Sequence, residues 1–275
     1  MKRKLSLSSL HILLLIIGLI WIYPFIWMIS ASLKKNFELI SSGLKLLPEK
    51  AQWVNYARAW NEANFSGYFL NTVIITIFTV LIILVMCALT GYALARVDFP
   101  GKKLFILVIT GTMFIPKGYT IIPIYIIIKQ LGLLNTLGGV ILAESSGAHV
   151  LFILLFMAYF SKLPKELEES AIMDGCGFFR TFWSIMLPLS KPIIATVAIM
   201  QFIWTWNSFF IPFVFTLNKP ELRTLAVGMY SFVGEHSVDW VGMTAAATIS
   251  LIPVIIIFIV FQRFFIEGVS GSVKG

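Results

Sequence analysis

The strongest constraint in the sequence is an apolar segment that runs from Tyr68 to Ala95 without one charged residue. A helix needs about 20 consecutive, mostly apolar residues to cross the hydrocarbon core of a bilayer. The surface helix of a soluble domain keeps one polar face, and this segment has none. The segment therefore predicts a transmembrane helix and restricts the chain to folds that are built in a membrane.

The composition agrees with a membrane as the main solvent. Hydrophobic residues make up 59% of the chain and charged residues only 12%, whereas a soluble domain carries about 25% charged residues. The net charge of +8 would suggest a polyanionic partner in a soluble protein. No basic run is interleaved with exposed aromatic residues, so nucleic-acid binding is not expected.

Apolar segments of spanning length recur along the chain, which predicts an all-α integral membrane protein with six transmembrane helices in one domain, residues 1–275. The predicted spans are residues 10–31, 68–95, 104–128, 140–160, 192–217 and 241–263. The first is longer than the about 7–15 apolar residues of a secretory signal, so we expect it to stay uncleaved. Basic clusters at residues 2–4 and 96–103 predict that both termini are cytoplasmic.

Residues 161–190, between the fourth and fifth predicted spans, have the sequence design of helices rather than of a short connector. Pro164 suits a first helical turn, and glutamates at 166, 168 and 169 would favour the helix dipole there. Gly175 comes where a helix end prefers a left-handed residue. Interfacial helices that bind lipid are typically basic, so the acidic face indicates a protein partner.

The same segment contains a spaced motif. Glu169-Ser170-Ala171 is followed after three residues by Gly175, and after nine more by Ile185-x-Leu187-Pro188. This pattern resembles the EAA loop of ABC importer permeases, Glu-Ala-Ala-x3-Gly-x9-Ile-x-Leu-Pro. Ser170 is the single departure, and a change from Ala to Ser is small enough to keep close packing.

The resemblance extends over nearly the whole chain, to the carbohydrate-importer branch of binding-protein-dependent permeases that is typified by the maltose permease G subunit. It is carried by Leu70-Asn71-Thr72, by the segment 91–96, by Trp206-Asn207 and by the end of the chain, 262–268 and 273–275. The resemblance implies a multi-pass protein of the bacterial cell membrane. It also implies a substrate that is a sugar or oligosaccharide, with an amino acid, a glycerophosphodiester or a similar solute as the alternative.

In that family the EAA loop is a coupling helix that sits in a cleft of an ATPase subunit. Glu169 would contact a basic group of the ATPase, Gly175 would permit a sharp bend, and the Ile185–Pro188 segment would anchor the loop. The residues that the resemblance assigns to coupling are Glu168, Glu169, Ser170, Ala171, Asp174, Gly175, Ile185, Leu187, Pro188, Lys274 and Gly275.

The implied partners are two ATP-binding cassette ATPases, a second homologous permease, an extracytoplasmic solute-binding protein and the lipid bilayer. The chain has no phosphate-binding G-x-x-x-x-G-K-S/T motif, so ATP and Mg²⁺ are expected in the partner subunits and no cofactor in this chain. No acid pair, metal-binding His/Cys set or Ser/His set lies within the spans, so we expect neither an enzyme nor a metal site.

Several polar or aromatic residues inside predicted spans are candidates for the substrate pathway. They are Asn71, Lys117, Trp204, Trp206 and Asn207. The alternative for Lys117, which a broken helix near the membrane edge favours, is a side chain that extends to the membrane surface. The alternative for the tryptophans and amides is an interfacial belt with helix–helix hydrogen bonds. Glu144 and Glu235 are expected to be solvated loop charges, with substrate or partner binding as the alternative.

Overall fold

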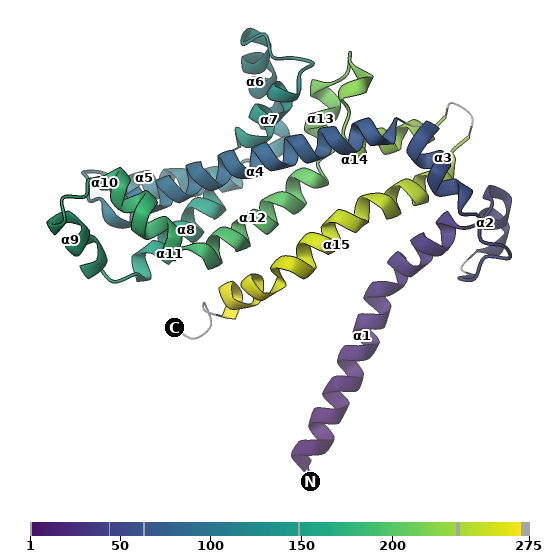
Figure 1. Ribbon diagram of the computed structural model, residues 1–275, viewed down its shortest axis with the longest axis horizontal. Helices are drawn as coiled ribbons and strands as arrows, with labels where there is room; N and C mark the ends of the chain where they lie inside the picture. The colour runs from purple at the N-terminus through teal and green to yellow at the C-terminus, as the bar shows by residue number, and fades with distance from the viewer. Residues whose placement is uncertain (1, 44, 63, 148, 235–236, 271–275) are drawn as a thin grey trace. The chain divides into compact units, whose positions relative to one another are not determined.

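The computed structural model describes residues 2–43, 45–62, 64–147, 149–234 and 237–270, without side chains for 2–7, 42, 62, 117 and 263–270. In these described residues the regular secondary structure is helical (Figure 1). An isolated antiparallel bridge also joins Val233 to Val238. The chain divides into two compact units: Met1–Gly67 with Val227–Pro253, and Tyr68–Ala226 with Val254–Gly275.

Helices of membrane-spanning length confirm the predicted fold class. Within the described part of the chain, three are long and apolar enough to cross a bilayer, at Ser8–Ser32, Phe65–Arg96 and Trp240–Gln262. Three bent helix pairs also qualify: Lys102–Phe114 with Gly118–Gln130, Leu137–Ser145 with Val150–Lys162, and Phe178–Leu189 with Lys191–Trp206. If each pair forms one span the total is six, the predicted number.

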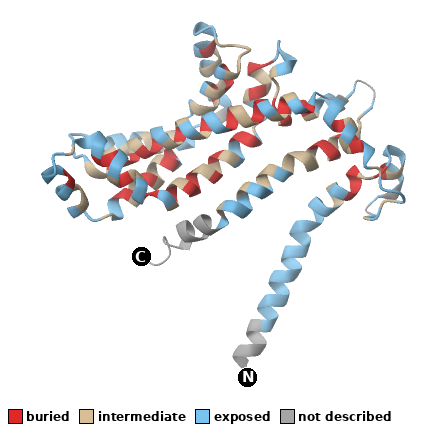
Figure 2. Ribbon diagram, in the orientation of Figure 1, coloured by how far each residue is buried: buried red, intermediate tan, exposed pale blue. Residues whose placement is uncertain are grey.

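The first unit contains one long helix and a small polar cap. Helix α1, Lys2–Ser32, is exposed along most of its described length (Figure 2), which leaves its apolar side chains for lipid or a partner. The cap holds α2, Asn36–Ser42, and α3, Val54–Glu62, and the short helix η4, Met229–Phe232. Ala31 packs with Leu39 and Val241, so α1, α2 and the start of α15, Trp240–Ser270, share a small core.

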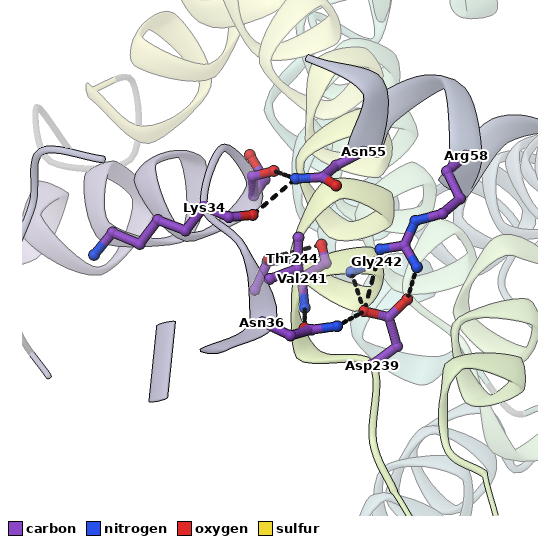
Figure 3. Close-up of polar contacts among 9 residues, drawn as sticks. Lys34, Asn36, Asn55, Arg58, Asp239, Val241, Gly242 and Thr244 are labelled. Atoms are coloured by element: carbon purple, nitrogen blue, oxygen red, sulfur yellow. Dashed lines mark hydrogen bonds and ion pairs between the residues drawn. The ribbon is translucent and has the colours of Figure 1, made fainter. Parts of the chain in front are cut away.

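Hydrogen bonds to the backbone hold this cap together. The side-chain amide of Asn55 donates to the carbonyl oxygens of Ser32 and Lys34, at 2.8 and 2.9 Å (Figure 3). The hydroxyls of Ser32 and Tyr56 lie 2.6 Å apart. Asn55 is buried, and these bonds satisfy carbonyls that the end of α1 would otherwise leave without partners.

Asp239 is the centre of a second polar network in the same unit. Its Oδ1 accepts from the N–H of Gly242 at 2.9 Å, and its Oδ2 lies 2.6 Å from Nη1 of Arg58 on α3 (Figure 3). The amide of Asn36 on α2 donates to Oδ1 at 3.1 Å, and its own oxygen accepts from Val241 N–H at 3.3 Å. Asp239 thus caps α15 and ties α2 and α3 to it.

The second unit is built around α4, Phe65–Arg96. Its inward side packs on α8, Val150–Lys162, on α12, Lys191–Trp206, and on the helical run 178–189. The shared core is aromatic and aliphatic; its members are Ile83, Cys87, Ala88, Tyr92, Phe152, Phe156, Phe160, Phe182, Met186, Ile193 and Val197. A Cβ on Gly91 would lie 2.5 Å from Cβ of Phe156, so the close approach of α4 and α8 requires glycine there.

A second core lies on another side of α4. Ile75 contacts Ile128 of α6, Lys117–Gln130, Val140 of α7, Leu137–Ser145, and Phe215 of α13, Phe210–Phe215. Helices α7 and α13 lie side by side (Figure 1). The remaining elements are α5, Lys102–Gly111, η1, Thr112–Phe114, η3, Pro220–Leu222, and α14, Leu225–Gly228.

Three predicted spans are broken in the structure. The segment 140–160 is one of them, because α7 ends at Ser145 and α8 begins at Val150 with a bend of 59° between the two helices. The segment 104–128 bends by 104° where η1 gives way to α6 after Pro116. Proline lacks the N–H that would continue the helix, and it disfavours helical geometry in the residue before it. The segment 192–217 divides at Asn207, where α12 ends before α13 begins.

Candidate functional site

The acidic motif of residues 161–190 folds as a separate short helix, α9, Glu166–Met173. Its first turn carries Glu166, Glu168 and Glu169, where negative charge interacts favourably with the N–H groups of a helix start. Figure 1 shows α9 beside α10, Phe178–Thr181, at one end of α4. The segment is therefore helical, as predicted, and Gly175 lies between its first two short helices.

The end of α9 is a Schellman motif at Gly175. The N–H of Gly175 donates to the carbonyl of Ile172, and the N–H of Cys176 donates to the carbonyl of Ala171, both at 2.9 Å. Gly175 has a φ of +79°, and a Cβ there would meet nothing within 4 Å. The glycine is therefore required by its left-handed backbone and not by close packing.

Helix α9 has one face against its own chain and one free face. Ala171 is buried, whereas Glu169, Ser170 and Asp174 are exposed. Ile172 and Met173 are 64% and 86% exposed at the tip. Large apolar side chains beside carboxylates on an exposed helix are typical of a surface that a protein partner covers.

Arg96, the last residue of α4, ties α9 to the bundle. Its Nη2 donates to the carbonyl of Leu163 at 2.7 Å, and its Nε lies 3.3 Å from Oε2 of Glu168. The two side chains are only 6% and 16% exposed, so water screens this ion pair weakly. The resemblance assigned Glu168 to coupling but did not assign Arg96 to it, since residues so far apart in the chain show no pattern that joins them.

The second part of the motif anchors the loop to the core. Residues Phe178–Thr181 form α10, Phe182–Met186 a π-helical turn, η2, and Leu187–Leu189 the short α11. Phe182 and Met186 are fully buried, and the ring of Tyr92 on α4 lies 4.8 Å from that of Phe178. The chain then bends by 81° into α12. Ile185 and Leu187 pack against the core, and Pro188 is exposed.

The other coupling candidates, Lys274 and Gly275, lie outside the described residues. Among the described residues, no three His, Cys, Asp or Glu side chains are arranged to hold a metal ion. Cys87 and Cys176 are free thiols.

Two of the substrate-pathway candidates are enclosed by their own chain. The amide of Asn71, which is buried, donates to the carbonyls of Glu221 and Arg223 at 2.8 and 3.1 Å. Trp206 is 4% exposed, and its ring lies 5.8 Å from Phe69 and 5.2 Å from Phe202. These side chains hold neighbouring segments together.

The remaining candidates stand at breaks in the helices. Trp204 is 42% exposed and stacks on Phe152 of α8, with ring centroids 5.0 Å apart. Asn207 is exposed at the end of α12, and its amide donates to the carbonyl of Ile203 at 2.8 Å. Lys117 is the first residue of α6, and its side chain lies outside the described part.

Glu144 is a residue that sequence reasoning misjudged. It was expected in a solvated loop, but it lies in α7, partly buried, and accepts a hydrogen bond from Oγ of Ser208 at 2.5 Å. The predicted fourth span, residues 140–160, already contained it, and a carboxylate within a span was the available signal. Glu235, the other expected loop charge, lies outside the described residues.

Spanning helices around α4, with an acidic helical loop held at the end of that helix, define a multi-pass membrane subunit. The chain belongs to the family of binding-protein-dependent transport system inner membrane components, whose model matches residues 68–271.

Individual relatives agree with the family. The chain is 33% identical to the diacetylchitobiose uptake system permease protein NgcG of Streptomyces coelicolor, and the match covers 96% of this chain and 86% of that protein. It is 31% identical to the melibiose/raffinose/stachyose import permease protein MelC of Bacillus subtilis, over 99% of both. A crystal structure of a bacterial ABC transporter that imports the acidic polysaccharide alginate contains a chain with a TM-score of 0.81 and 28% identity, over 96% of this chain and 97% of that one.

Family membership fixes the general function. The chain is a permease subunit of an ABC importer and lies in the cell membrane. It is a transport subunit and not an enzyme, and the family implies separate ATPase and solute-binding partners.

Proposed function

We propose that this chain forms half of the translocation pathway for a sugar or oligosaccharide, and that α9 couples the pathway to ATP hydrolysis. The observation that carries the coupling role is the division of α9 into two faces. Glu168 and Ala171 are held by the chain itself, while Glu169, Ile172 and Met173 are presented outward.

The outward face fits a cleft in an ATPase subunit. Glu169 would pair with a basic side chain, and Ile172 and Met173 would supply apolar contact that becomes dry on docking. The face is small, so the affinity of its binding to the ATPase depends on how rigidly α9 is held. The Schellman motif at Gly175 and the ion pair of Arg96 with Glu168 supply that rigidity.

Movement of the docked ATPases would then reach the bundle through two attachments. Arg96 links α9 to α4, and Phe182 and Met186 link the following helix to the aromatic core. Rigid-body displacement of packed helices is a known means of switching a pathway between two states. In this proposal the anchor also includes Ile185, Leu187 and Pro188. The tail at Lys274 and Gly275 would contact the ATPase dimer.

The complete importer would contain two ATPases, a second homologous permease and an extracytoplasmic solute-binding protein. ATP and Mg²⁺ would bind in the ATPases. In this arrangement the chain crosses the membrane six times with both termini in the cytoplasm, which agrees with three long helices and three bent pairs. The coupling loop then lies on the side of the ATPases.

A sugar is the proposed solute because NgcG and MelC carry diacetylchitobiose uptake and melibiose/raffinose/stachyose import in their names. The exposed Trp204 agrees with this class, since aromatic faces stack on sugar rings. Asn71, Lys117, Trp206 and Asn207 remain candidates for lining or shaping the pathway.

Purification of the chain from its native membrane tests the assembly. We expect an ATPase, a second permease and a sugar-binding protein to co-purify. Recovery of the chain without a nucleotide-binding partner contradicts the proposal.

Uptake by variants tests the coupling face. Glu169→Lys and Gly175→Asp should abolish uptake while the amount of solute-binding protein is unchanged. Asp98→Lys reverses a carboxylate whose side chain is 98% exposed in another loop, and this control should transport normally. Wild-type uptake by the Glu169→Lys variant removes the coupling role from α9.

A further inference from the structure

The helical run Phe178–Leu189, here called the anchor run, has an outward side that the coupling proposal does not use. Phe182 and Met186 are fully buried, whereas Phe179 and Trp183 are 63% and 50% exposed. Arg180 is exposed next to Phe179. The anchor run therefore has one side in the aromatic core and an aromatic, basic side that faces outward.

The anchor run turns sharply away from α12. The bend between the two is 81°, and α12 begins the predicted fifth span, in which no charged residue follows Lys191 before Lys219. The hydroxyl of Tyr159 on α8 donates to the carbonyl of Leu189 at 2.9 Å, which fixes the end of the run beside the bend. A segment that lies at nearly a right angle to a spanning helix runs close to the plane of the membrane.

Aromatic contacts place the anchor run at the level of the membrane boundary. The ring of Tyr92, one turn before the end of α4, lies 4.8 Å from that of Phe178 and 5.4 Å from that of Phe182. The ring of Phe160, two residues before the end of α8, lies 6.4 Å from that of Phe182. The run thus packs on the flanks of these helices and not on their ends. Its outward side lies where spanning helices leave the hydrocarbon, the zone in which tryptophan is enriched.

Charge separates the two parts of the coupling loop. The first turn of α9 carries three glutamates, whereas the anchor run and the residue that follows Ser190 carry Arg180 and Lys191 and no acid. Both basic side chains are exposed. Helices that lie on a membrane combine aromatic residues with Lys or Arg, and the anionic cytoplasmic leaflet attracts basic residues near its surface. The same surface repels α9, so the two parts suit different partners.

We infer that Phe179, Arg180 and Trp183 form an interaction surface for anionic phospholipid, with Lys191 at its edge. The two rings enter the boundary between headgroups and acyl chains, and the two basic side chains pair with lipid phosphate. The proposed six-span arrangement, on which this rests, makes that leaflet the cytoplasmic one. Lipid on one side and the aromatic core on the other hold the anchor run in place, which leaves α9 as the part of the loop that a protein partner covers.

Fluorescence quenching in the complete importer, reconstituted in nanodiscs of phosphatidylcholine, tests this surface. In a chain whose Cys87 and Cys176 are replaced by Ser, an NBD label is attached at Phe179→Cys. Met173→Cys, at an 86% exposed position of α9, carries the same label as the control. The quenchers are iodide in the water and nitroxide-labelled phosphatidylglycerol or phosphatidylcholine in the bilayer.

The label at position 179 should be quenched by nitroxide lipid and spared by iodide. The label at position 173 should be spared by nitroxide lipid, because the ATPase covers it. Phosphatidylglycerol should quench the label at position 179 at a lower mole fraction than phosphatidylcholine does. Trp183→Cys gives a second labelling position on the same surface, with the same expected pattern.

Removal of one charge tests the preference for anionic lipid. With the label at position 179, Arg180→Gln should raise the phosphatidylglycerol fraction that gives half-maximal quenching by about fivefold, the contribution of one basic residue near an anionic surface. Lys103→Gln removes an exposed charge from another loop, and it should leave that fraction unchanged. Equal shifts in the two variants overturn the role of Arg180.

The other outcomes are equally decisive. Strong iodide quenching at positions 179 and 183 shows that the surface faces water and overturns the inference. Quenching by neither iodide nor lipid shows that protein covers the surface and also overturns it. Equal quenching by the two lipids overturns the choice of an anionic one. Lipid quenching at position 179 in an importer that takes up no sugar supports the surface while contradicting the proposed function.

Discussion

Nε of Arg96 lies 3.3 Å from Oε2 of Glu168, and this contact joins the end of α4 to the acidic helix α9. Arg96 also donates to the carbonyl of Leu163, just before α9 begins. One side chain therefore fixes both the start of the loop and its first turn. Because α4 runs through both cores of the second unit, a displacement of α9 acts directly on the helix around which the bundle is packed.

Removal of Arg96 should destabilise the protein and uncouple it. Arg96→Ala leaves the shielded carboxylate of Glu168 without a counter-charge, which costs about 3 kcal/mol. Thermal unfolding in detergent measures the loss, and uptake should fall with it. Lys102→Ala is the control, because its partner Asp98 is 98% exposed and such a pair contributes below about 1 kcal/mol. Equal effects of the two substitutions contradict the assignment.

Gly175 should tolerate only residues that accept a left-handed backbone. Gly175→Ala places a Cβ at a φ of +79°, at a cost of about 1–2 kcal/mol, and should lower uptake by tilting the end of α9. Gly175→Asn should be milder. Gly177→Ala is the matched control, since Gly177 has a φ of −80°. If Gly177→Ala lowers uptake more than Gly175→Ala does, the left-handed backbone of Gly175 is not what makes this loop sensitive to substitution.

The network of Asp239 should make the cap of the first unit sensitive to acid. Burial raises the pKa of Asp239, but the hydrogen bonds from Gly242, Arg58 and Asn36 outweigh it and hold the pKa below its ordinary value. An unfolded Asp has a pKa of about 3.9. The stabilisation is therefore complete above that pH and is lost as the pH falls through the folded pKa.

Thermal unfolding of wild type and Asp239→Asn between about pH 3 and pH 7 tests this dependence. We expect wild type to be more stable by a constant amount near neutral pH, and the difference to shrink below about pH 4. A difference that shrinks as the pH rises contradicts the network.

Asn71 should act by holding the loop that lies against the N-terminal part of α4. Its amide donates to the carbonyls of Glu221 and Arg223, and each bond contributes about 1 kcal/mol. Asn71→Ala and Asn71→Asp should be equally harmful, because a carboxylate has no donor for these carbonyls. The rate of maleimide labelling at Leu222→Cys should rise in both variants. The control is Leu70→Ala, because the side chain of Leu70 is 58% exposed. An unchanged labelling rate in the Asn71 variants would show that the loop is held without Asn71.

Sequence reasoning recovered what depends on local pattern. The uncharged run 68–95 corresponds to α4, Phe65–Arg96, and the glycine at 175 corresponds to the end of α9. Both signals lie within one turn or one helix, where side-chain type and spacing decide the structure.

What the sequence did not reveal depends on contacts between distant segments. The pairing of Arg96 with Glu168 and of Glu144 with Ser208 arises only when α4, α7, α8 and α12 pack. Pro116 marks the break within the segment 104–128, but the end of α12 at Trp206 has no proline, and the position of that break was missed. Apolar composition predicts that a segment enters the membrane, and not that it crosses as one straight helix.

Crosslinking from the tip of α9 tests the coupling role most directly. The background is a chain in which Cys87 and Cys176 are both replaced by Ser. In that background Met173→Cys places a thiol at a position whose side chain is 86% exposed. The control variant is Leu47→Cys, whose thiol lies in the other unit at a position that is 77% exposed. A short bifunctional maleimide applied to native membranes should join the Met173→Cys chain to an ATPase subunit, with a yield that changes when ATP is added. The Leu47→Cys chain should give no such product. Absence of an ATPase crosslink from Met173→Cys, in membranes that still import, contradicts the assignment of α9 as the coupling helix.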